Sequence, residues 1–334
     1  MSAGELRVGL LGAGRIGRIH GSNISAHPRA RLVALADASA DAARSLADAT
    51  GAVVRDLNAI VQAADIDAVL IGTPTDTHAD LIERAARAGK AIFCEKPVSL
   101  DADRTRACLD VVRETGARLM VGFNRRFDPN FATLKQRIVA GEIGSVELVT
   151  ILSRDPSPPP LDYVARSGGL FRDMMIHDFD MARFLLGEEP VEVHAVGACL
   201  VDPGIGQAGD VDTAAVLLKT VSGKIAQISN SRRATYGYDQ RVEVHGSTGL
   251  LAAGNQHATT VTFAGEHGYA SDTALPFFLE RYAQAYRNEL ESFVTGILDG
   301  KTLMPSGEDG LRAQILADAA TQSAKTGESV RVGI

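Results

Sequence analysis

The segment LRVGLLGAGRIG, near the amino terminus, constrains the fold more than any other part of the chain. The apolar strand pattern LRVGLL runs directly into Gly12-Ala13-Gly14-Arg15-Ile16-Gly17, and the helix-like segment RIGRIHGSNIS follows. The next strand pattern, RLVALAD, ends at Asp37. A strand, a GxGxxG turn, a helix and an acidic residue at the end of the second strand form the dinucleotide-binding fingerprint. The sequence therefore predicts a Rossmann-type start.

The rest of the first third extends this pattern. The apolar runs AVLIGTP, AIFCEKP and RLMVGF are separated by Ala-rich stretches of helical period, such as DADRTRACLDVVRETG. Strands that alternate with helices indicate βαβ units and a parallel sheet. We predict that residues 1–123 form an α/β domain, a doubly wound parallel sheet that binds a dinucleotide.

The pattern changes near Phe123 and predicts a second domain, residues 124–334. A helical stretch (128–144), a strand (146–154) and a proline-rich loop (155–163) come first, followed by one helix from Gly168 to Gly187. Beyond Pro190 the chain is rich in strand patterns: VEVHAVGACLV, DTAAVLLKT, GKIAQISNS, QRVEVHG and TTVTFAG. The VSGK turn between two of them predicts a hairpin. Two helices close the chain, so we expect an α+β domain with a large open, mostly antiparallel sheet.

Composition narrows the class of protein. The net charge is -7 and no Lys/Arg-rich run is present, which argues against a nucleic-acid partner. No apolar stretch approaches the length of about 18 residues that a membrane helix needs. Three scattered cysteines indicate a reduced, cytoplasmic setting. The eight histidines are spread singly and without ligand spacing, so we expect no metal.

The glycine turn and Asp37 together predict the cofactor. The glycines Gly12, Gly14 and Gly17 let the backbone approach a pyrophosphate at the helix N-terminus. Asp37 would accept hydrogen bonds from the adenosine ribose, and its charge would repel a 2′-phosphate. This favours NAD over NADP. Arg15 could assist with phosphate, or it could be an ordinary charge on the helix surface.

The turn Cys94-Glu95-Lys96-Pro97 ends a strand at the carboxyl edge of the sheet, where open α/β sheets bind ligands. An ammonium group at this edge can hold a substrate hydroxyl and stabilise the alkoxide character that develops as hydride leaves. Pro97 could be cis. The alternative for Lys96 is a solvated turn without a catalytic role.

Asp173 and His177 are polar residues four apart in the otherwise apolar stretch GGLFRDMMIHDFDMARFLLG. Residues at this spacing share a helix face. Burying such groups without partners costs about 1–3 kcal/mol or more. One interpretation is structural: Asp173 and His177 hydrogen-bond to each other in the core and have no catalytic role. The other is catalysis, with His177 taking a hydroxyl proton near neutral pH and Asp173 orienting the imidazole or binding substrate.

Four motifs resemble the glucose–fructose oxidoreductase/inositol dehydrogenase (Gfo/Idh/MocA) family over essentially the whole chain. They are the GAGRIG turn, Thr73-Pro74 with His78, Glu95-Lys96-Pro97, and GFNRRF at 122–127, and the Asp-x-x-x-His pair Asp173/His177 matches the family's second domain. The resemblance implies that Lys96 lies between nicotinamide and substrate. It also implies a homotetramer. The cofactor-side residues it implies are Gly12, Gly14, Arg15, Ile16, Gly17, Asp37, Thr73, Pro74, His78, Glu95 and Lys96.

The substrate is predicted to be a small-molecule polyol. Arg126, Asp155 and Tyr236 are candidate hydrogen-bonding residues beside Lys96, Asp173 and His177, and each of the three could instead be part of the scaffold. The segments from Ser153 to Leu185 and from Arg232 to Gly249 are similar to the myo-inositol 2-dehydrogenase branch, which implies oxidation of myo-inositol to its 2-keto form. Open alternatives are another sugar or cyclitol, such as scyllo-inositol or a glucose-type pyranose, and an NAD-binding regulator without catalysis.

Overall fold

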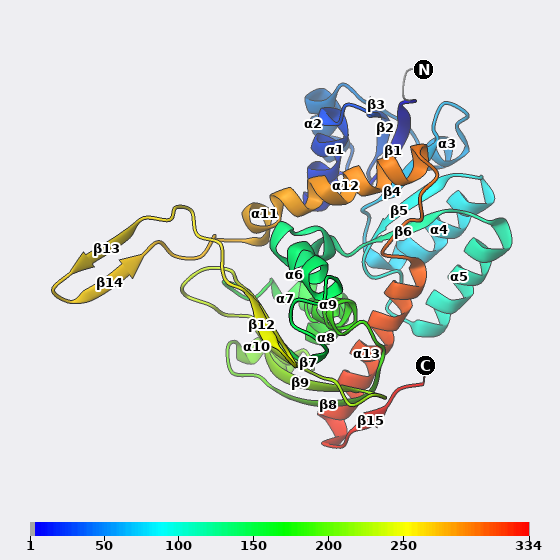
Figure 1. The fold of residues 1–334 in the computed structure, drawn as a ribbon. Helices are drawn as coiled ribbons and strands as arrows, with labels where there is room; N and C mark the ends of the chain where they lie inside the picture. Colours follow the sequence, from blue (N-terminus) through cyan, green and yellow to red (C-terminus); the bar gives the residue numbers. More distant parts are fainter. Residues whose placement is uncertain (1–3, 334) are drawn as a thin grey trace. The chain divides into compact units, whose positions relative to one another are not determined.

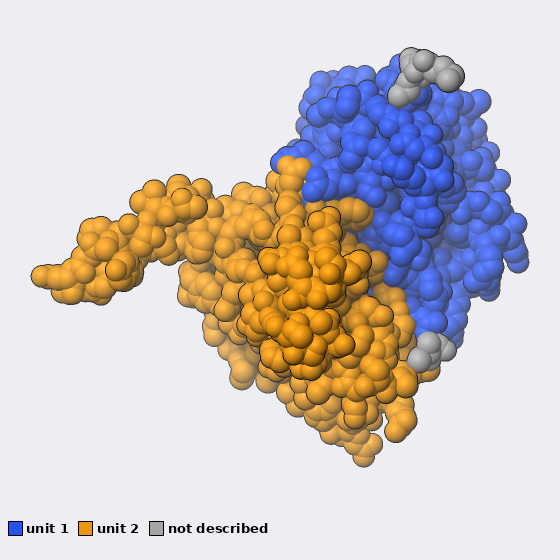
Figure 2. All heavy atoms as spheres, in the orientation of Figure 1, with its two compact units in different colours: residues 1–124, 285–314 blue, residues 125–284, 315–334 orange. Residues whose placement is uncertain are grey.

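The computed structural model describes residues 4–333 and divides the chain into two compact units. Unit 1 contains residues 1–124 and 285–314, and unit 2 contains residues 125–284 and 315–334 (Figures 1 and 2). The sequence predicts a junction near residue 123 but assigns residues 285–314 to the second domain. No helix in the described range is both long enough and apolar enough to cross a lipid bilayer.

Unit 1 is built on a six-stranded sheet with the order β3-β2-β1-β4-β5-β6, in which every neighbouring pair is parallel. This confirms the predicted doubly wound parallel sheet. The order reverses between β1 and β4, which is where such sheets bind ligands. The strands are β1 (Leu6–Leu11), β2 (Ala30–Ala36), β3 (Val53–Val54), β4 (Ala68–Ile71), β5 (Ala91–Glu95) and β6 (Leu119–Gly122).

Helices connect the strands of unit 1, and several have clear sequence signals at their ends. Asp101 accepts hydrogen bonds at the start of α5, and Gly116 adopts a left-handed conformation at its end. Asp56 caps α3 in the same way. Such caps satisfy backbone groups that a helix leaves unpaired. The helices are α1 (Arg15–Ala26), α2 (Ala40–Thr50), α3 (Leu57–Gln62), α4 (His78–Arg87) and α5 (Ala102–Thr115), with a 3₁₀ turn η1 (Thr75–Thr77).

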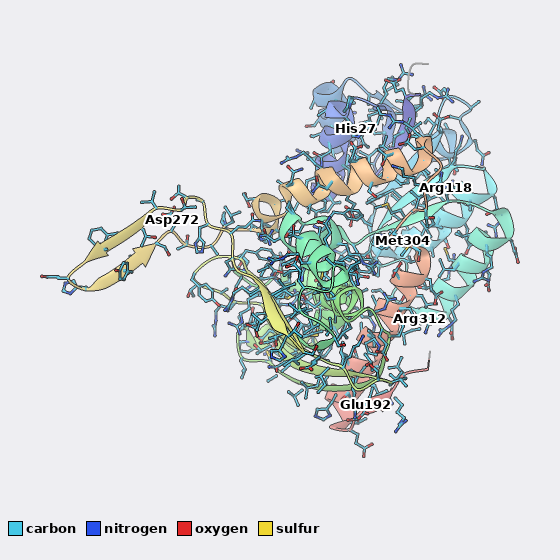
Figure 3. The ribbon with its side chains drawn as sticks, viewed as in Figure 1. His27, Arg118, Glu192, Asp272, Met304 and Arg312 are labelled. Atoms are coloured by element: carbon cyan, nitrogen blue, oxygen red, sulfur yellow. The ribbon has the colours of Figure 1, made fainter. Side chains whose placement is uncertain are left out.

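Helix α12 (Ala283–Leu298) joins unit 1 through its packing. Phe293 makes an edge-to-face contact with Phe93 of β5, with ring centroids 5.7 Å apart. His27 contacts Glu291 at 2.9 Å, and Arg118 donates to the carbonyls of Gly296 and Ile297; His27 and Arg118 are labelled in Figure 3. These partners lie more than 150 residues apart in the chain, so local sequence pattern does not reveal them.

Unit 2 is built on a seven-stranded sheet with the order β12-β11-β7-β10-β9-β8-β15. Only β10 and β7 pair in parallel, so the predicted, mostly antiparallel sheet is confirmed. The VSGK turn joins β9 to β10 in the expected hairpin. The strands are β7 (Val146–Arg154), β8 (Pro190–Ala198), β9 (Thr213–Thr220), β10 (Ile225–Ser231), β11 (Asp239–Gly246), β12 (Gly249–Ala253) and β15 (Val330–Arg331).

Helices cover one face of this sheet, and α9 packs directly against β7 and β10. Along β9 buried and exposed residues alternate, so the second face is open. The helices are α6 (Pro129–Val139), α7 (Leu161–Ser167), α8 (Gly169–Asp173), α9 (Ile176–Leu186), α10 (Pro203–Gln207) and α11 (Phe278–Arg281). The division between the units falls within α13 (Gly307–Thr326).

The segment TTVTFAG contains a strand of the second domain, as predicted, but this strand does not join the large sheet. The last four residues of the segment form β13 (Thr262–Gly265). Among residues 4–333, β13 pairs only with β14 (Gly268–Ser271), in a separate hairpin that is the yellow arm of Figure 1. Every residue of both strands is exposed. A strand pattern alone does not tell which sheet a strand joins.

Candidate active site

The glycine turn after β1 brings backbone into close contact with backbone. Gly12 has φ +103°, and a Cβ there would lie 2.5 Å from the carbonyl oxygen of Gly72, which follows β4. A Cβ on Gly17 would lie 2.0 Å from the carbonyl oxygen of Gly12. At Gly14, by contrast, a Cβ would meet nothing within 4 Å. Two glycines are therefore required by the fold, while the third leaves open space beside the backbone.

This open space lies at the start of α1, where the backbone offers hydrogen-bond donors. Gly14 is the N-cap, and within residues 4–333 no side chain accepts a hydrogen bond at this cap and no acidic residue stands in the first turn. The positive end of α1 thus suits a phosphate group. Arg15 and Ile16 are the first two residues of α1, so the predicted turn residues all stand together.

Asp37 is held against the glycine turn. Its Oδ2 accepts from the Ala13 amide at 2.6 Å and its Oδ1 accepts from the Ser39 amide at 2.7 Å. Each carboxylate oxygen has two lone pairs, so the side chain can still accept from ribose hydroxyls. These residues fit a dinucleotide with a free 2′-hydroxyl.

Thr73, Pro74 and His78 lie in the segment after β4 that contacts the Lys96–Pro97 turn through His78. The buried imidazole of His78 places Nδ1 2.7 Å from the Pro97 carbonyl oxygen and Nε2 2.8 Å from the Thr73 carbonyl oxygen. The Thr73 hydroxyl contacts that of Thr77 at 2.6 Å. His78 therefore ties the loop after β4 to the turn after β5. Its two ring nitrogens both face carbonyl groups of the chain.

Lys96 directly follows β5, and the Lys96–Pro97 peptide bond is cis, as the sequence suggests. The preceding residue, Glu95, contacts the buried ring of His20 across 2.6 Å. Glu95 therefore anchors the turn that carries Lys96 to helix α1.

Asp173 and His177 do not lie on one continuous helix, so that prediction is wrong. Asp173 ends α8 and His177 is the second residue of α9. The Leu170 carbonyl accepts from the amides of both Met174 and Met175, which widens the turn between the helices. Met174, Met175 and Ile176 are all buried. Three consecutive buried side chains do not fit one face of a regular helix, and the break accommodates them.

The two glycines before Asp173 allow a close contact within the protein, between the backbone and the side chain of Asp210. Gly168 and Gly169 both have positive φ, and a Cβ on Gly169 would lie 2.7 Å from an oxygen of Asp210. That carboxylate accepts from the Leu170 amide at 3.0 Å. The backbone at Gly169 therefore lies close to the Asp210 carboxylate, which accepts a hydrogen bond at the start of α8.

The structure assembles a group that we call the carboxylate cluster: Asp155, Asp173, Arg232 and Tyr163. The Tyr163 hydroxyl donates to Asp173 Oδ1 at 2.8 Å, and Arg232 Nη2 donates to Asp173 Oδ2 at 3.4 Å. Arg232 Nη1 lies 4.0 Å from Asp155 Oδ2. The guanidinium thus sits between two carboxylates.

Burial dominates the electrostatics of the carboxylate cluster. It raises the pKa of Asp155 to about 6, opposed by the positive charge of Arg232 and reinforced by the negative charge of Asp173. Burial, with Asp173 nearby, also raises the pKa of the Tyr163 hydroxyl, which remains a donor at neutral pH. The cluster therefore offers both acceptors and donors, the pattern that a polyhydroxylated ligand requires.

Arg126 and Tyr236 have other partners. Arg126 donates to both oxygens of Asp180, from Nε at 2.8 Å and Nη2 at 2.6 Å, and its neighbour Arg125 pairs with buried Asp178. The Tyr236 hydroxyl donates to Asp239 at 2.7 Å and accepts from Arg154 at 3.1 Å. Of the predicted substrate residues in unit 2, the structure brings Asp155 and Asp173 together and commits the Arg126 side chain to Asp180.

Tyr236 lines a surface pocket of about 340 Å³ with Arg154 and Arg233. It is 43% exposed, and Ser229 and Ser231 of β10 line the same pocket, whereas no member of the carboxylate cluster does.

Sequence reasoning missed Arg232 and Tyr163. One signal was available for Arg232. Ala226, Ile228 and Asn230 alternate along the buried face of β10, and the next position in this alternation is Arg232. A charged residue at such a position needs buried partners of opposite charge. Tyr163 has no comparable signal, because it lies on a short helix after the proline loop.

Two family models match the chain. The model described as "Oxidoreductase family, NAD-binding Rossmann fold" covers residues 6–123, and the model described as "GFO/IDH/MocA C-terminal domain" covers residues 131–252. An inositol 2-dehydrogenase from Rhizobium meliloti is 62% identical over 318 residues, 95% of this chain and 96% of that protein.

Solved structures are also similar to this chain. The crystal structure of a myo-inositol dehydrogenase from Corynebacterium glutamicum has a TM-score of 0.95 and 45% identity, covering 99% of each chain. A scyllo-inositol dehydrogenase from Lactobacillus casei, with bound NAD(H) and scyllo-inositol, has a TM-score of 0.91 and 33% identity, covering 98% of this chain and 99% of that one.

Proposed function

The chain belongs to the GFO/IDH/MocA oxidoreductase family, and we propose that it oxidises the 2-hydroxyl of myo-inositol to the ketone with NAD as the hydride acceptor. The observation that carries this proposal is the carboxylate cluster of unit 2. Asp155 and Asp173 supply hydroxyl acceptors, and Arg232 and Tyr163 supply donors. The names of the inositol dehydrogenases that this chain resembles support the same substrate class.

The domain roles follow from the same premise. We propose that residues 1–123 bind NAD through the glycine turn, Asp37 and the loops that carry Thr73 and Glu95. Residues 124–334 bind the polyol. In this assignment Arg126 and Tyr236 act indirectly on the polyol site. Arg126 pairs with Asp180, and the Tyr236 hydroxyl donates a hydrogen bond to Asp239.

The reaction assigns each catalytic residue one task. NAD, when bound, accepts the hydride from the carbinol carbon. His177 takes the hydroxyl proton as the C–O bond becomes a carbonyl, because an imidazole titrates close to neutral pH. Lys96 donates a hydrogen bond to the reacting oxygen and stabilises its developing negative charge. Asp173 binds a substrate hydroxyl and favours the protonated form of His177.

Asp37 sets the preference for NAD. Its carboxylate is fixed by two backbone amides and faces the position of the ribose hydroxyls in dinucleotide-binding sheets. A 2′-phosphate at this position would meet a like charge. We therefore expect little turnover with NADP.

The test is a substrate panel followed by absorbance of the reduced cofactor. Purified protein is mixed with NAD or NADP and, in turn, with myo-inositol, scyllo-inositol, glucose and other pyranoses. The proposal predicts the highest kcat/KM for myo-inositol with NAD. A higher value for scyllo-inositol or a pyranose would reassign the substrate. NAD binding without turnover of any compound would favour a regulator.

We further propose that the chain is cytoplasmic and assembles as a homotetramer through the open face of the large sheet. That face exposes Val196, Leu217 and Ile225 on three adjacent strands. Apolar side chains that gather on an open face mark a surface that another molecule covers. Light scattering of the parent and of Leu217→Glu tests this, since a charge in the interface should lower the mass in solution.

A further inference from the structure

Glu289, in the middle of α12, is a buried acid that the proposed chemistry does not use. Its side chain is fully buried, and neither carboxylate oxygen has a hydrogen-bond partner within the described part of the chain. An ionised carboxylate in such a place would be strongly disfavoured, because it would lose its hydration without gaining a partner. Burial, together with the negative charge of Glu95, accordingly raises the pKa of Glu289 well above its ordinary value.

Helix geometry shows which way Glu289 faces. Tyr286, Glu289 and Phe293 are three and four residues apart and share one face of α12. Tyr286 packs edge-on against His20 of α1, with ring centroids 5.7 Å apart, and Phe293 packs against Phe93 of β5. Glu289 therefore faces the surface that α1 and β5 form together.

That surface carries the pair that anchors the Lys96 turn. His20 Nε2 lies 2.6 Å from Glu95 Oε1, and the ring of His20 also packs on Phe93. His20 Nδ1 is buried and has no hydrogen-bond partner among residues 4–333. Glu95, His20 and Glu289 form what we call the buried-acid cluster. It lies among the rings of Phe93, Tyr286 and Phe293, and its member Glu95 directly precedes Lys96 in the chain.

The charges around Glu289 come from three elements. Helix α1 contributes His20 and, about two turns further along at its C-cap, His27; β5 contributes Glu95; and α12 itself contributes Tyr286 and Glu291. His27 is already bound to Glu291 near the surface, so it does not serve Glu289. Of the acidic residues in this set, Glu95 is the one that directly precedes Lys96 in the chain.

We propose that Glu289 is a positioning residue that acts through Glu95 on Lys96. While Glu289 keeps its proton, Glu95 carries the only negative charge of the buried-acid cluster and remains bound to His20. When Glu289 loses its proton at high pH, two carboxylates repel each other inside an apolar enclosure, and Glu95 is displaced from His20. Displacement moves the Lys96 turn and lowers the rate of alcohol oxidation. This account rests on the proposed dehydrogenase function.

The experiment compares pH profiles of kcat for the parent, Glu289→Gln and Glu289→Leu. Neither replacement can ionise, so both should retain activity to higher pH than the parent, with the alkaline limit raised by about one pH unit or more. Near pH 7 the Gln variant should match the parent within about twofold. Glu291→Gln, an acid on the same helix that binds His27 near the surface, is the matched control and should leave the limit unchanged.

A second readout is independent of turnover. The infrared difference spectrum between parent and Glu289→Gln at pH 7 should contain the carbonyl stretch of a protonated carboxylic acid, which disappears as the pH rises. The proposal would be overturned if kcat of the parent and of both variants fell at the same alkaline pH. It would also be overturned if the carbonyl stretch of a protonated carboxylic acid were absent from the spectrum. If no polyol is turned over, the dehydrogenase proposal fails, while the spectrum still decides the protonation of Glu289.

Discussion

In unit 1 the proposed phosphate-binding groups belong to the backbone, whereas in unit 2 the proposed polyol-binding groups belong to side chains. The glycine turn works because Gly12 and Gly17 lack a Cβ and the start of α1 presents amides. The carboxylate cluster forms because Asp155, Asp173 and Arg232 meet from a loop, a helix end and the end of a strand. Backbone sites are fixed by short local motifs. Side-chain sites depend on how distant elements pack.

This difference predicts that the two ligands can be lost separately. Replacing a unit 2 side chain should abolish turnover and leave NAD binding intact. Altering the glycine turn should weaken NAD binding, and turnover with it, while the polyol-binding side chains of unit 2 stay in place. The following predictions test this separation, from the largest expected effect to the smallest.

The largest effect is expected for His177→Ala. A positioned general base contributes about 10²–10⁴-fold to the rate, so kcat for myo-inositol should fall by that factor. The NAD dissociation constant, measured by calorimetry, should remain within about twofold of the parent. A variant that turns over substrate at the parent rate would remove His177 from the chemistry.

Arg232→Met should mainly lower stability and polyol affinity. Removing one partner of a fully buried ion pair costs about 3–5 kcal/mol. Asp155 and Asp173 are only partly buried, so we expect a loss at or below the lower end of that range. Urea denaturation should detect this loss, and KM for the polyol should rise. The neighbouring Arg233 is exposed, so Arg233→Met is the control and should change neither quantity appreciably.

Two alanine substitutions separate fold from ligand within the glycine turn. Gly17→Ala places a Cβ against the Gly12 carbonyl and should destabilise unit 1 by about 1–3 kcal/mol. Gly14→Ala meets no atom within 4 Å, so its melting temperature should match the parent while NAD binding weakens, because the methyl group occupies the space beside the helix N-terminus. Equal effects of the two variants on melting would contradict this assignment.

The smallest effect concerns Asp155 and pH. Burial raises the pKa of this carboxyl to about 6, so the folded protein holds a proton that the unfolded chain releases near pH 4. As the pH rises from about 4 to about 6, this group therefore lowers the free energy of unfolding, and above pH 6 its contribution is constant. Asp155→Asn should remove that part of the pH dependence in urea titrations. An unchanged profile would contradict the raised pKa.

The comparison also explains what the sequence could predict. The Rossmann sheet and the positions of Gly12, Asp37 and Lys96 follow from motifs in which neighbouring residues define the geometry. The break between Asp173 and His177 was missed, because spacing alone does not reveal that Met174, Met175 and Ile176 all become buried. The place of α12 in unit 1 and the Asp155–Arg232 pairing depend on contacts across long stretches of chain, which periodicity does not encode.

The most direct test of the central claim uses myo-inositol that carries deuterium on C2. The protein is incubated with this substrate and NAD, and the reduced cofactor is analysed by mass spectrometry. The account predicts that the deuterium appears in the reduced nicotinamide and that turnover is slower than with unlabelled substrate. Reduced cofactor without deuterium would show that the hydride comes from another carbon, and an absence of reduced cofactor would contradict the proposed reaction altogether.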